Sequence, residues 1–336
     1  MQFIPDGEPI DAPQPVRGVA LTDDEIAAIL ANLARVPLGI DIEQEFRISI
    51  AGAQEKTALL RHDGRWMRPV GTTPTTHILK PQLGEIPTSA GMIDLSDSVE
   101  NEHFCLALLA GFGLPVARTE VAHFGDRRVL VVERFDRRWR GEDQLLRLPQ
   151  EDFCQALSVP SGRKYQSQGG PGVVDLLAKL RESDDPLTDQ ALVLKSQILF
   201  WLIGATDGHA KNFSVFLRPG GRFQLTPFYD VLTAQPAFDA HRIPHRSYKL
   251  AMSVGATPHC KILDLHGRHF VETAKKAGIG PAVIRAVIDD VRAKAAGAAE
   301  EARRAMPADF PDALHQAVAA AIEARLPRLD TADDAF

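Results

Sequence analysis

Two carboxylates and an amide in the second half of the chain have types and spacing that suit chemistry. Asp207 and Asn212 stand five positions apart in a polar turn that contains glycine, and Asp230 follows 18 positions later, directly after Tyr229. Carboxylate and amide oxygens are hard ligands of the kind that Mg²⁺ prefers, and a carboxylate beside an attacking hydroxyl can accept its proton. Together the three side chains could hold a metal-bound phosphate and activate a hydroxyl, which is the chemistry of phosphoryl transfer.

The hydrophobic pattern around the turn indicates the elements that must position these side chains. The apolar run 198–203 predicts the end of a buried helix, and residues 213–217 predict a strand that leads away from the turn. Asp and Asn are also common turn formers, so the pair alone fits a plain turn equally well. The later Asp230 favours chemistry, because an Asp, an Asn five positions on and a later Asp form the catalytic spacing of protein kinases.

The composition is that of a globular protein and argues against several classes of function. Of the 336 residues, 45% are hydrophobic and 24% are charged, and the formal net charge of −6 gives no general basic field for nucleic acid. The three cysteines, at positions 105, 154 and 260, lie too far apart in sequence to suggest a metal-binding pair or a disulfide framework. Without a signal-peptide start or a long apolar run, the sequence predicts a soluble cytoplasmic protein with no membrane contact.

The N-terminal half has the pattern of a small sheet with a phosphate-binding loop. Residues 22–25 form a capping box that predicts a helix, and alternation over residues 46–50 predicts a strand. The small-residue loop 51–56 could lay backbone N–H groups along phosphate oxygens, although an ordinary hairpin explains the loop alone more simply. A later strand-like run ends at Lys80, where kinases place the lysine that contacts ATP phosphates.

The helix expected from residue 98 to about residue 111 offers two partners for this lysine. Glu100 or Glu102 could pair with Lys80, although acids in a first helical turn are also explained by the helix dipole. Strands at 116–124 and 129–133 then lead into a mostly helical half. Helices are expected there at residues 150–158, 172–181, 188–204, 268–278, 281–304 and 311–325.

These patterns predict an α+β fold with the two lobes of a protein kinase. The small, β-rich N-terminal lobe would span residues 1–135, and the larger, mostly helical C-terminal lobe residues 136–326. The tail 327–336 is expected to be frayed. The polar stretch 161–172 is expected to be a surface loop and residues 231–260 to be irregular.

Six segments of the sequence match those of a known family. They are FRISIAGAQEKTALL at 46–60, TTHILK at 75–80, VERFDRRW at 132–139, LPQED at 148–152, WLIGATDGHAKNFSV at 201–215 and LTPFYD at 225–230. Their order along the chain makes them far more specific together than any one motif is alone. On these segments the chain resembles the HipA family of bacterial serine/threonine kinases, which are the toxins of toxin–antitoxin pairs.

The resemblance implies a role for each matched residue. Asp207 would be the catalytic base, with Asn212 and Asp230 as the Mg²⁺ ligands. Ser49, on the polar side of its expected strand, matches a serine that family members autophosphorylate, which would switch the enzyme off. ATP would be contacted by the loop residues Ala51, Gly52, Ala53, Gln54, Glu55 and Lys56, by Lys80, His209 and Lys211, and by the backbone of the hinge residues Glu133 and Phe135.

The resemblance also implies a substrate and partners. The chain would be an ATP- and Mg²⁺-dependent toxin that phosphorylates an aminoacyl-tRNA synthetase, of the glutamyl or tryptophanyl type. Its partner would be a HipB-like helix-turn-helix antitoxin, through which it would meet DNA only indirectly. Family members commonly begin with a further small subdomain, so the chain is expected to be a shortened form whose missing piece comes from a separate small protein. The residues alone leave open a small-molecule phosphotransferase or a non-catalytic module that binds ATP or an antitoxin.

Overall fold

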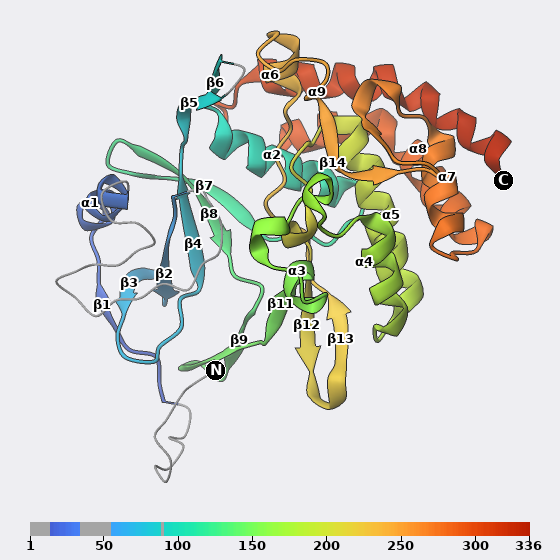
Figure 1. The fold of residues 1–336 in the computed structure, drawn as a ribbon. Helices are drawn as coiled ribbons and strands as arrows, with labels where there is room; N and C mark the ends of the chain where they lie inside the picture. The colour runs from blue at the N-terminus through green and yellow to red at the C-terminus, as the bar shows by residue number, and fades with distance from the viewer. Residues whose placement is uncertain (1–13, 34–54, 89–90) are drawn as a thin grey trace.

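The computed structural model describes residues 14–33, 55–88 and 91–336, which fold into two lobes. In Figure 1 a β-sheet with the helix α1 forms the smaller lobe, and the helices drawn in yellow-green to red form most of the larger one. The described residues mix helices and strands as an α+β protein does, which confirms the predicted fold class. The expected strand over residues 46–50 and loop residues 51–54 lie outside the described residues.

The smaller lobe is built on a six-stranded antiparallel sheet with the order β1-β3-β2-β4-β8-β7. Its strands are β1 (Gly18–Ala20), β2 (Thr57–His62), β3 (Arg65–Pro69), β4 (His77–Pro81), β7 (Thr119–Phe124) and β8 (Arg127–Glu133). Alternate residues of β8 point to opposite faces. Val129 and Val131 pack with α1 (Asp23–Asn32), while Leu130 and Val132 pack with α2 (Ser98–Gly111). A helix therefore covers each face and fixes β4, the strand that carries Lys80.

Local sequence signals set the connections around this sheet. The predicted capping box at the start of α1 is present, because Glu25 N donates to Thr22 Oγ1 and Thr22 N donates to Glu25 Oε2. Ile26 and Leu30 on the inner side of α1 are buried against the sheet. Between β4 and α2 the chain forms a separate antiparallel hairpin of β5 (Gly84–Thr88) and β6 (Gly91–Leu95).

The larger lobe combines short hairpins with a helical body. Its strands are β9 (Arg137–Arg140), β10 (Gln144–Arg147), β11 (Gln150–Asp152), β12 (Ser214–Arg218), β13 (Arg222–Leu225), β14 (Lys249–Val254) and β15 (His259–Lys261). Its α-helices are α3 (Phe153–Ala156), α4 (Val173–Lys179), α5 (Pro186–Ile203), α6 (Gln235–Asp239), α7 (Gly267–Lys276), α8 (Pro281–Arg304) and α9 (Asp312–Arg325). Its 3-10 helices are η3 (Ser161–Arg163), η4 (Gln166–Gln168), η5 (Leu180–Glu182), η6 (Ala210–Asn212), η7 (Pro219–Gly221), η8 (Ile262–Asp264) and η9 (Leu326–Ala335).

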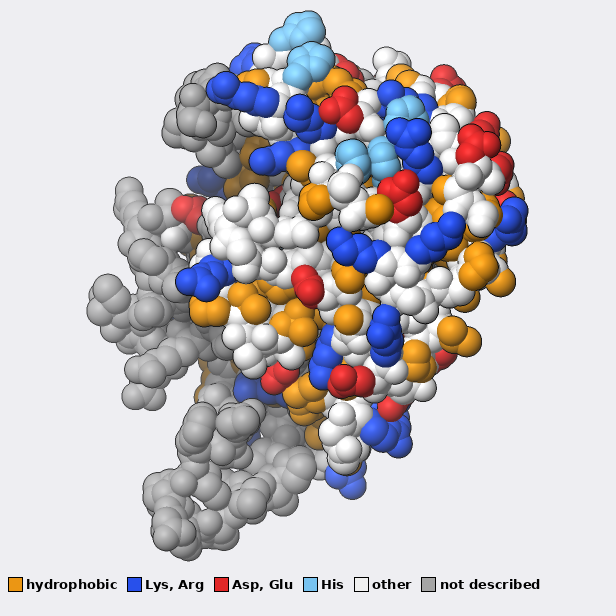
Figure 2. Space-filling view, turned by 45° about the vertical axis from the view of Figure 1, so that its right-hand side comes forward, with side chains coloured by type: hydrophobic (Ala, Val, Ile, Leu, Met, Phe, Trp, Pro, Cys, Tyr) orange, Lys and Arg blue, Asp and Glu red, His pale blue; other side chains and the backbone are white. Residues whose placement is uncertain are grey.

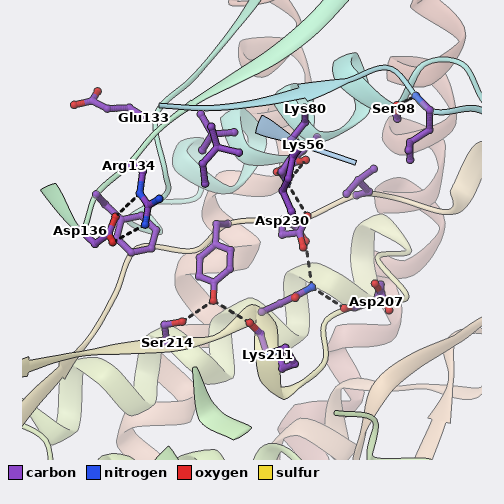
Figure 3. Close-up of a pocket in the computed structure, with 18 of the residues that line it drawn as sticks. Lys56, Lys80, Ser98, Glu133, Arg134, Asp136, Asp207, Lys211, Ser214 and Asp230 are labelled. Carbon is purple, nitrogen blue, oxygen red and sulfur yellow. Dashed lines mark hydrogen bonds and ion pairs between the residues drawn. The ribbon is translucent and has the colours of Figure 1, made fainter. Parts of the chain in front are cut away.

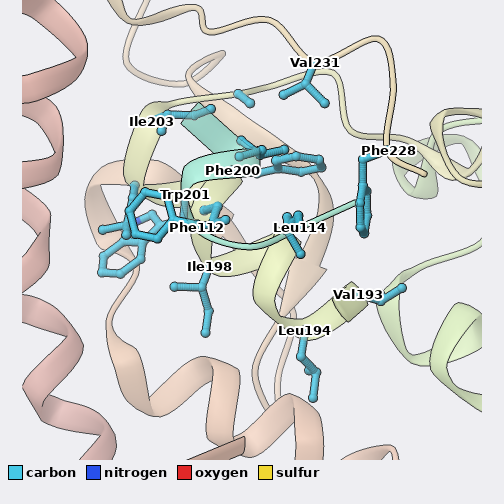
Figure 4. Close-up of a cluster of buried hydrophobic side chains, with 14 of the residues drawn as sticks. Phe112, Leu114, Val193, Leu194, Ile198, Phe200, Trp201, Ile203, Phe228 and Val231 are labelled. Carbon is cyan, nitrogen blue, oxygen red and sulfur yellow. The ribbon is translucent and has the colours of Figure 1, made fainter. Parts of the chain in front are cut away.

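The helix α5 runs through the centre of this lobe. Its last six residues, 198–203, are all apolar, and such a segment is stable only when it is buried all round. Figure 4 shows Ile198, Phe200 and Trp201 of α5 beside Phe112 and Phe228, which come from distant parts of the chain. All five side chains are buried. The core therefore fixes the end of α5, from which the predicted catalytic turn continues.

A glycine and a buried guanidinium end α5. Gly204 adopts a left-handed conformation, with φ of +72°, and its N–H caps the helix. Arg325 of α9 donates to the carbonyl oxygens of Trp201 and Leu202 at 3.2 and 2.7 Å and to the Tyr248 hydroxyl at 2.9 Å. A cation at a helix C-terminus satisfies carbonyls that lack helical partners. The start of the catalytic turn is thus held by the last α-helix of the chain.

Several boundaries differ from those predicted. The tail expected to be frayed forms η9, whose Leu329 and Ala332 are buried against the helical core. The helix predicted at 150–158 is reduced to α3, because β11 pairs with β12 directly before it. Residues 231–260, expected to be irregular, contain α6 and β14. In each case a long-range contact outweighs the weak local pattern.

The surface of the larger lobe carries mixed charge. On the face that Figure 2 turns forward, Lys and Arg side chains are interspersed with Asp and Glu. This distribution is consistent with the small net charge of the sequence. Among the described residues, no helix combines the length and apolar character needed to cross a membrane.

We predict that Gly204→Ala destabilises the protein much more than Gly220→Ala. Both glycines have positive φ, +72° and +81°, so each substitution brings the backbone cost of about 1–2 kcal/mol. A Cβ at Gly220 meets nothing within 4 Å, whereas one at Gly204 would stand 2.0 Å from the buried Tyr248 hydroxyl. Overpacking there should cost roughly 1–3 kcal/mol more. Denaturant unfolding of the two variants measures the difference, and equal losses would contradict the packing argument.

Candidate active site

A cleft of about 1930 Å³ between the lobes brings together most of the described residues that the sequence singled out. Figure 3 shows Lys56 and Lys80 on one side of it and Asp207, Lys211 and Asp230 on the other. The other predicted site residues that line the cleft are Glu102, Glu133, Phe135, His209 and Asn212. Residues from both lobes therefore face one space, as a kinase site requires.

An ion triad of buried Lys80 and Glu102 with half-buried Asp230 joins the two lobes at the centre of the cleft. The Lys80 ammonium lies 2.8 Å from each carboxylate oxygen of Glu102 and 2.8 Å from Asp230 Oδ1. Burial alone would lower the pKa of Lys80, but the two carboxylates outweigh it and raise the pKa above its ordinary value. The Lys80 charge in turn lowers the pKa of Asp230. Burial raises the pKa of Glu102 even though the Lys80 charge opposes it. Lys80 and Asp230 are therefore charged at neutral pH.

The geometry decides between the two predicted partners of Lys80. Glu102 faces Lys80, whereas Glu100 forms an ion pair with Arg128. The same helix also holds the segment after Asp230, because Asn101 Nδ2 donates to Thr233 O at 2.9 Å and Asn101 Oδ1 accepts from Thr233 N at 2.8 Å. The helix α2 thus fixes Lys80 and the Asp230 segment at the same time.

Asn212 links the two predicted acids, Asp207 in the same turn and Asp230 on the later segment. Its amide nitrogen donates to the backbone oxygen of Asp207 at 2.9 Å and to that of Asp230 at 3.4 Å. The amide oxygen of Asn212 and the carboxylate of Asp230 are the atoms suited to bind a cation. No cluster of three or more His, Cys, Asp or Glu side chains suited to a metal occurs within residues 14–33, 55–88 and 91–336. Two protein ligands suit Mg²⁺ bound with a nucleotide, because phosphates and water complete its shell.

The side chain of Asp207 is 63% exposed in the cleft and touches a residue that the sequence interpretation missed. The hydroxyl of Tyr165 donates to Asp207 Oδ1 at 2.5 Å. Tyr165 lies in the polar stretch 161–172, for which a surface loop was expected, and the neighbouring Lys164 lines the cleft. The expectation of a plain surface loop is therefore wrong for this part of the stretch.

His209 and Lys211 lie in the turn that carries Asp207 and Asn212, and each contacts other residues of the protein. Lys211 forms an ion pair with Asp152 at 2.7 Å, and Tyr229 donates to the backbone oxygen of Lys211. The ring of His209 is buried, and this burial lowers its pKa, so the imidazole is neutral at pH 7. Its Nδ1 has no hydrogen-bond partner among the described residues. Both residues line the cleft, although His209 Nδ1 itself is buried.

The segment between the lobes is rigid but only partly open to a ligand. The backbone N–H of Glu133 donates to Arg118 O, so this group is not available to adenine. Phe135 packs with Tyr229 at a ring distance of 5.6 Å, and Asp136 pairs with Arg134 at 2.9 Å. An adenine ring would therefore have to bind to other groups of this segment.

The N-terminal part of the expected phosphate loop cannot be placed in this site. Ser49, Ala51, Gly52, Ala53 and Gln54 lie outside the described residues. Of the remaining two, Glu55 is exposed and Lys56 lines the cleft. Burial and the nearby charge of Lys80 lower the pKa of Lys56. Lys56 thus lies close enough to the triad for its amine to interact with Lys80, Asp230 and Glu102.

The fold is protein-kinase-like, with a sheet lobe and a helical lobe on either side of a cleft. The cleft holds a buried pair of a strand lysine and a helix glutamate, together with an Asp–Asn–Asp set. Residues 48–299 match the HipA-like C-terminal domain, HipA_C, and the chain belongs to this family. It also superposes on HipA in the complex of Shewanella oneidensis HipA, HipB and operator DNA with a TM-score of 0.76, covering 99% of this chain and 76% of that one. At 22% identity this likeness shows the fold.

Two curated relatives extend the comparison. The chain is 37% identical over 289 residues to the Sinorhizobium fredii protein named "Putative kinase Y4mE", covering 85% of this chain and 64% of that protein. It is 32% identical over 202 residues to the Shewanella oneidensis protein named "Serine/threonine-protein kinase toxin HipA", covering 56% of this chain and 43% of that one. The chain thus spans less than two thirds of the length of either relative.

We predict that Asn212→Ala and Asp230→Ala remove the Mg²⁺ dependence of ATP binding. Changes around a metal site typically weaken metal affinity ~10–100-fold. Calorimetry of ATP with and without Mg²⁺ measures the dependence, and Asn212→Ala is the cleaner variant because Asp230 also contacts Lys80. Asp94→Asn, an exposed carboxylate at the cleft rim, is the control. Unchanged Mg²⁺ dependence in both variants would remove these residues from the metal site.

Proposed function

We propose that the chain is an ATP- and Mg²⁺-dependent serine/threonine protein kinase that acts as a growth-inhibiting toxin. The observation that carries the proposal is the convergence of the Lys80–Glu102 pair with Asp207, Asn212 and Asp230 in one cleft. Membership of the HipA-like family supports it. By the family resemblance, the substrate is an aminoacyl-tRNA synthetase of the glutamyl or tryptophanyl type.

In the proposed reaction the residues of the cleft divide the work of phosphoryl transfer. Lys80, held by Glu102, contacts the phosphates of ATP. Mg²⁺ held by Asn212 and Asp230 supplies positive charge to the phosphates. Asp207 accepts the proton of the substrate hydroxyl as its oxygen bonds to the γ-phosphorus and the bond to the β,γ-bridging oxygen breaks, so that ADP leaves. The exposed position of the Asp207 carboxylate lets a bulky protein substrate reach it.

The first test is Asp207→Asn, which should abolish transfer while the fold stays intact. Removing a positioned base typically lowers the rate ~10²–10⁴-fold. Wild type and variant are incubated with Mg-ATP, with and without purified glutamyl- or tryptophanyl-tRNA synthetase, and phosphate is counted by intact mass. Asp126→Asn, in a turn outside the cleft, should keep full activity. An Asp207→Asn variant within a few-fold of wild type would refute the role of Asp207.

The same measurement separates the other functions that the residues leave open. Phosphate on a synthetase supports the proposal. Phosphate only on small molecules would favour a small-molecule phosphotransferase, and no use of ATP would favour a non-catalytic module. We further propose that Ser49 is autophosphorylated and that this switches the enzyme off, because a phosphate beside the expected loop would compete with ATP for the same N–H groups. Peptide mapping of the modified chain tests the position.

We also propose a HipB-like helix-turn-helix antitoxin as the partner of this chain, either alone or together with a further small protein. The Shewanella complex contains HipA, HipB and operator DNA, and this composition supports the antitoxin as a partner. We expect a tagged chain expressed from its native operon to co-purify with the antitoxin. A chain that emerges alone while its operon neighbours are expressed and soluble would contradict the prediction.

A further inference from the structure

Tyr165 makes the closest described contact to the Asp207 carboxylate. Its hydroxyl donates to Asp207 Oδ1 at 2.5 Å, and its ring meets His209 edge-on with a centroid distance of 4.9 Å. The backbone oxygen of the preceding Lys164 accepts from Ala210 N at 3.4 Å. Two consecutive residues of the 161–172 loop therefore contact three positions of the catalytic turn.

The Asp207 side chain needs such a contact. It is 63% exposed, and an exposed carboxylate without a partner populates several rotamers. Among the ion pairs of the described residues, the carboxylate has one further contact, from His209 Nε2 to Oδ2 at 4.0 Å, which is too long for a hydrogen bond. Tyr165 thus fixes Oδ1 and leaves Oδ2 open to the cleft.

The loop that carries Tyr165 is itself fixed. Gln166 Oε1 accepts from Ser253 N at 2.6 Å and from Ser253 Oγ at 2.9 Å, which ties the loop to β14. Gly170 N donates to Tyr165 O at 3.0 Å, and a Cβ at Gly170 would stand 2.0 Å from Arg163 O. The compact turn therefore requires glycine at position 170, and it presents the phenol from a rigid support.

We propose that Tyr165 is a positioning residue for phosphoryl transfer, which holds Asp207 Oδ1 and so directs Oδ2 toward the hydroxyl of the substrate. The inference rests on the proposed kinase function. In the transfer, the substrate proton goes to Oδ2 while Tyr165 keeps its own proton and its bond to Oδ1. Burial and the neighbouring Asp207 raise the pKa of Tyr165, so the phenol remains a donor throughout the neutral range. Preorganisation of this kind supports catalysis because small misplacements of a reacting group are costly.

The test is Tyr165→Phe, which keeps the ring against His209 and removes only the hydroxyl. Single-turnover incorporation of ³²P from γ-labelled Mg-ATP is followed on the full chain and on purified glutamyl- and tryptophanyl-tRNA synthetase. We expect the maximal rate to fall about 10–100-fold, while the ATP concentration at half-maximal rate stays within about twofold. Ser167→Ala, an exposed change in the same loop, should leave both values unchanged.

A double-mutant cycle separates positioning from a general loosening of the loop. If Tyr165 acts through Asp207, adding Tyr165→Phe to Asp207→Asn should cause no further loss. An equal, additive loss in that background would overturn the inference, as would a Tyr165→Phe variant as fast as or faster than wild type. Wild type that transfers no phosphate to itself or to either synthetase would overturn the proposed function instead.

Discussion

The rest of the structure depends on one buried ammonium group. Lys80 is 6% exposed, and leaving it without its carboxylates would cost roughly 3–5 kcal/mol. Its partners come from a helix and from a segment of the other lobe, Glu102 and Asp230. Strand β4, helix α2 and the Asp230 segment must therefore be in place together. The Lys80 ammonium that would contact the ATP phosphates is therefore also the group that joins the two lobes and maintains the form of the cleft.

The catalytic turn has a second, independent support. Helix α5 ends at Gly204. There Arg325 donates to the backbone oxygen of Leu202 and to the Tyr248 hydroxyl, and Thr233 donates to the backbone oxygen of Ile203. These contacts come from the C-terminal half of the chain, so the position of Asp207 depends in part on Arg325, more than a hundred positions away. The ion triad holds the two lobes together across the cleft, and the capped end of α5 supports the turn that lines it. Both supports use hydrogen-bonded side chains, and Lys80, Glu102, Arg325 and Tyr248 among them are buried.

The sequence predicted the parts of this site that local spacing encodes. The turn with Asp207 and Asn212, the strand that ends near Lys80 and the helix with Glu102 are each short patterns, and the structure brings them to one cleft. Tyr165 was missed because its contact spans 42 positions and nothing in a polar, glycine-rich stretch marks one tyrosine. The bonds from Asn101 to Thr233 span 132 positions and were invisible for the same reason. Long-range pairing of ordinary residue types leaves no periodic signal.

The attachment of α2 has a consequence for how the two lobes can move. Besides Glu102, the helix carries Asn101, bonded twice to the Thr233 backbone, and Phe104, whose ring packs at a tilt against Phe310 of the larger lobe. These contacts attach α2 to the larger lobe, although its Glu102 pairs with Lys80 of the smaller lobe. Swinging this helix outward would break the Asn101–Thr233 bonds and expose Phe104 of the core, so α2 and the larger lobe should move as one unit.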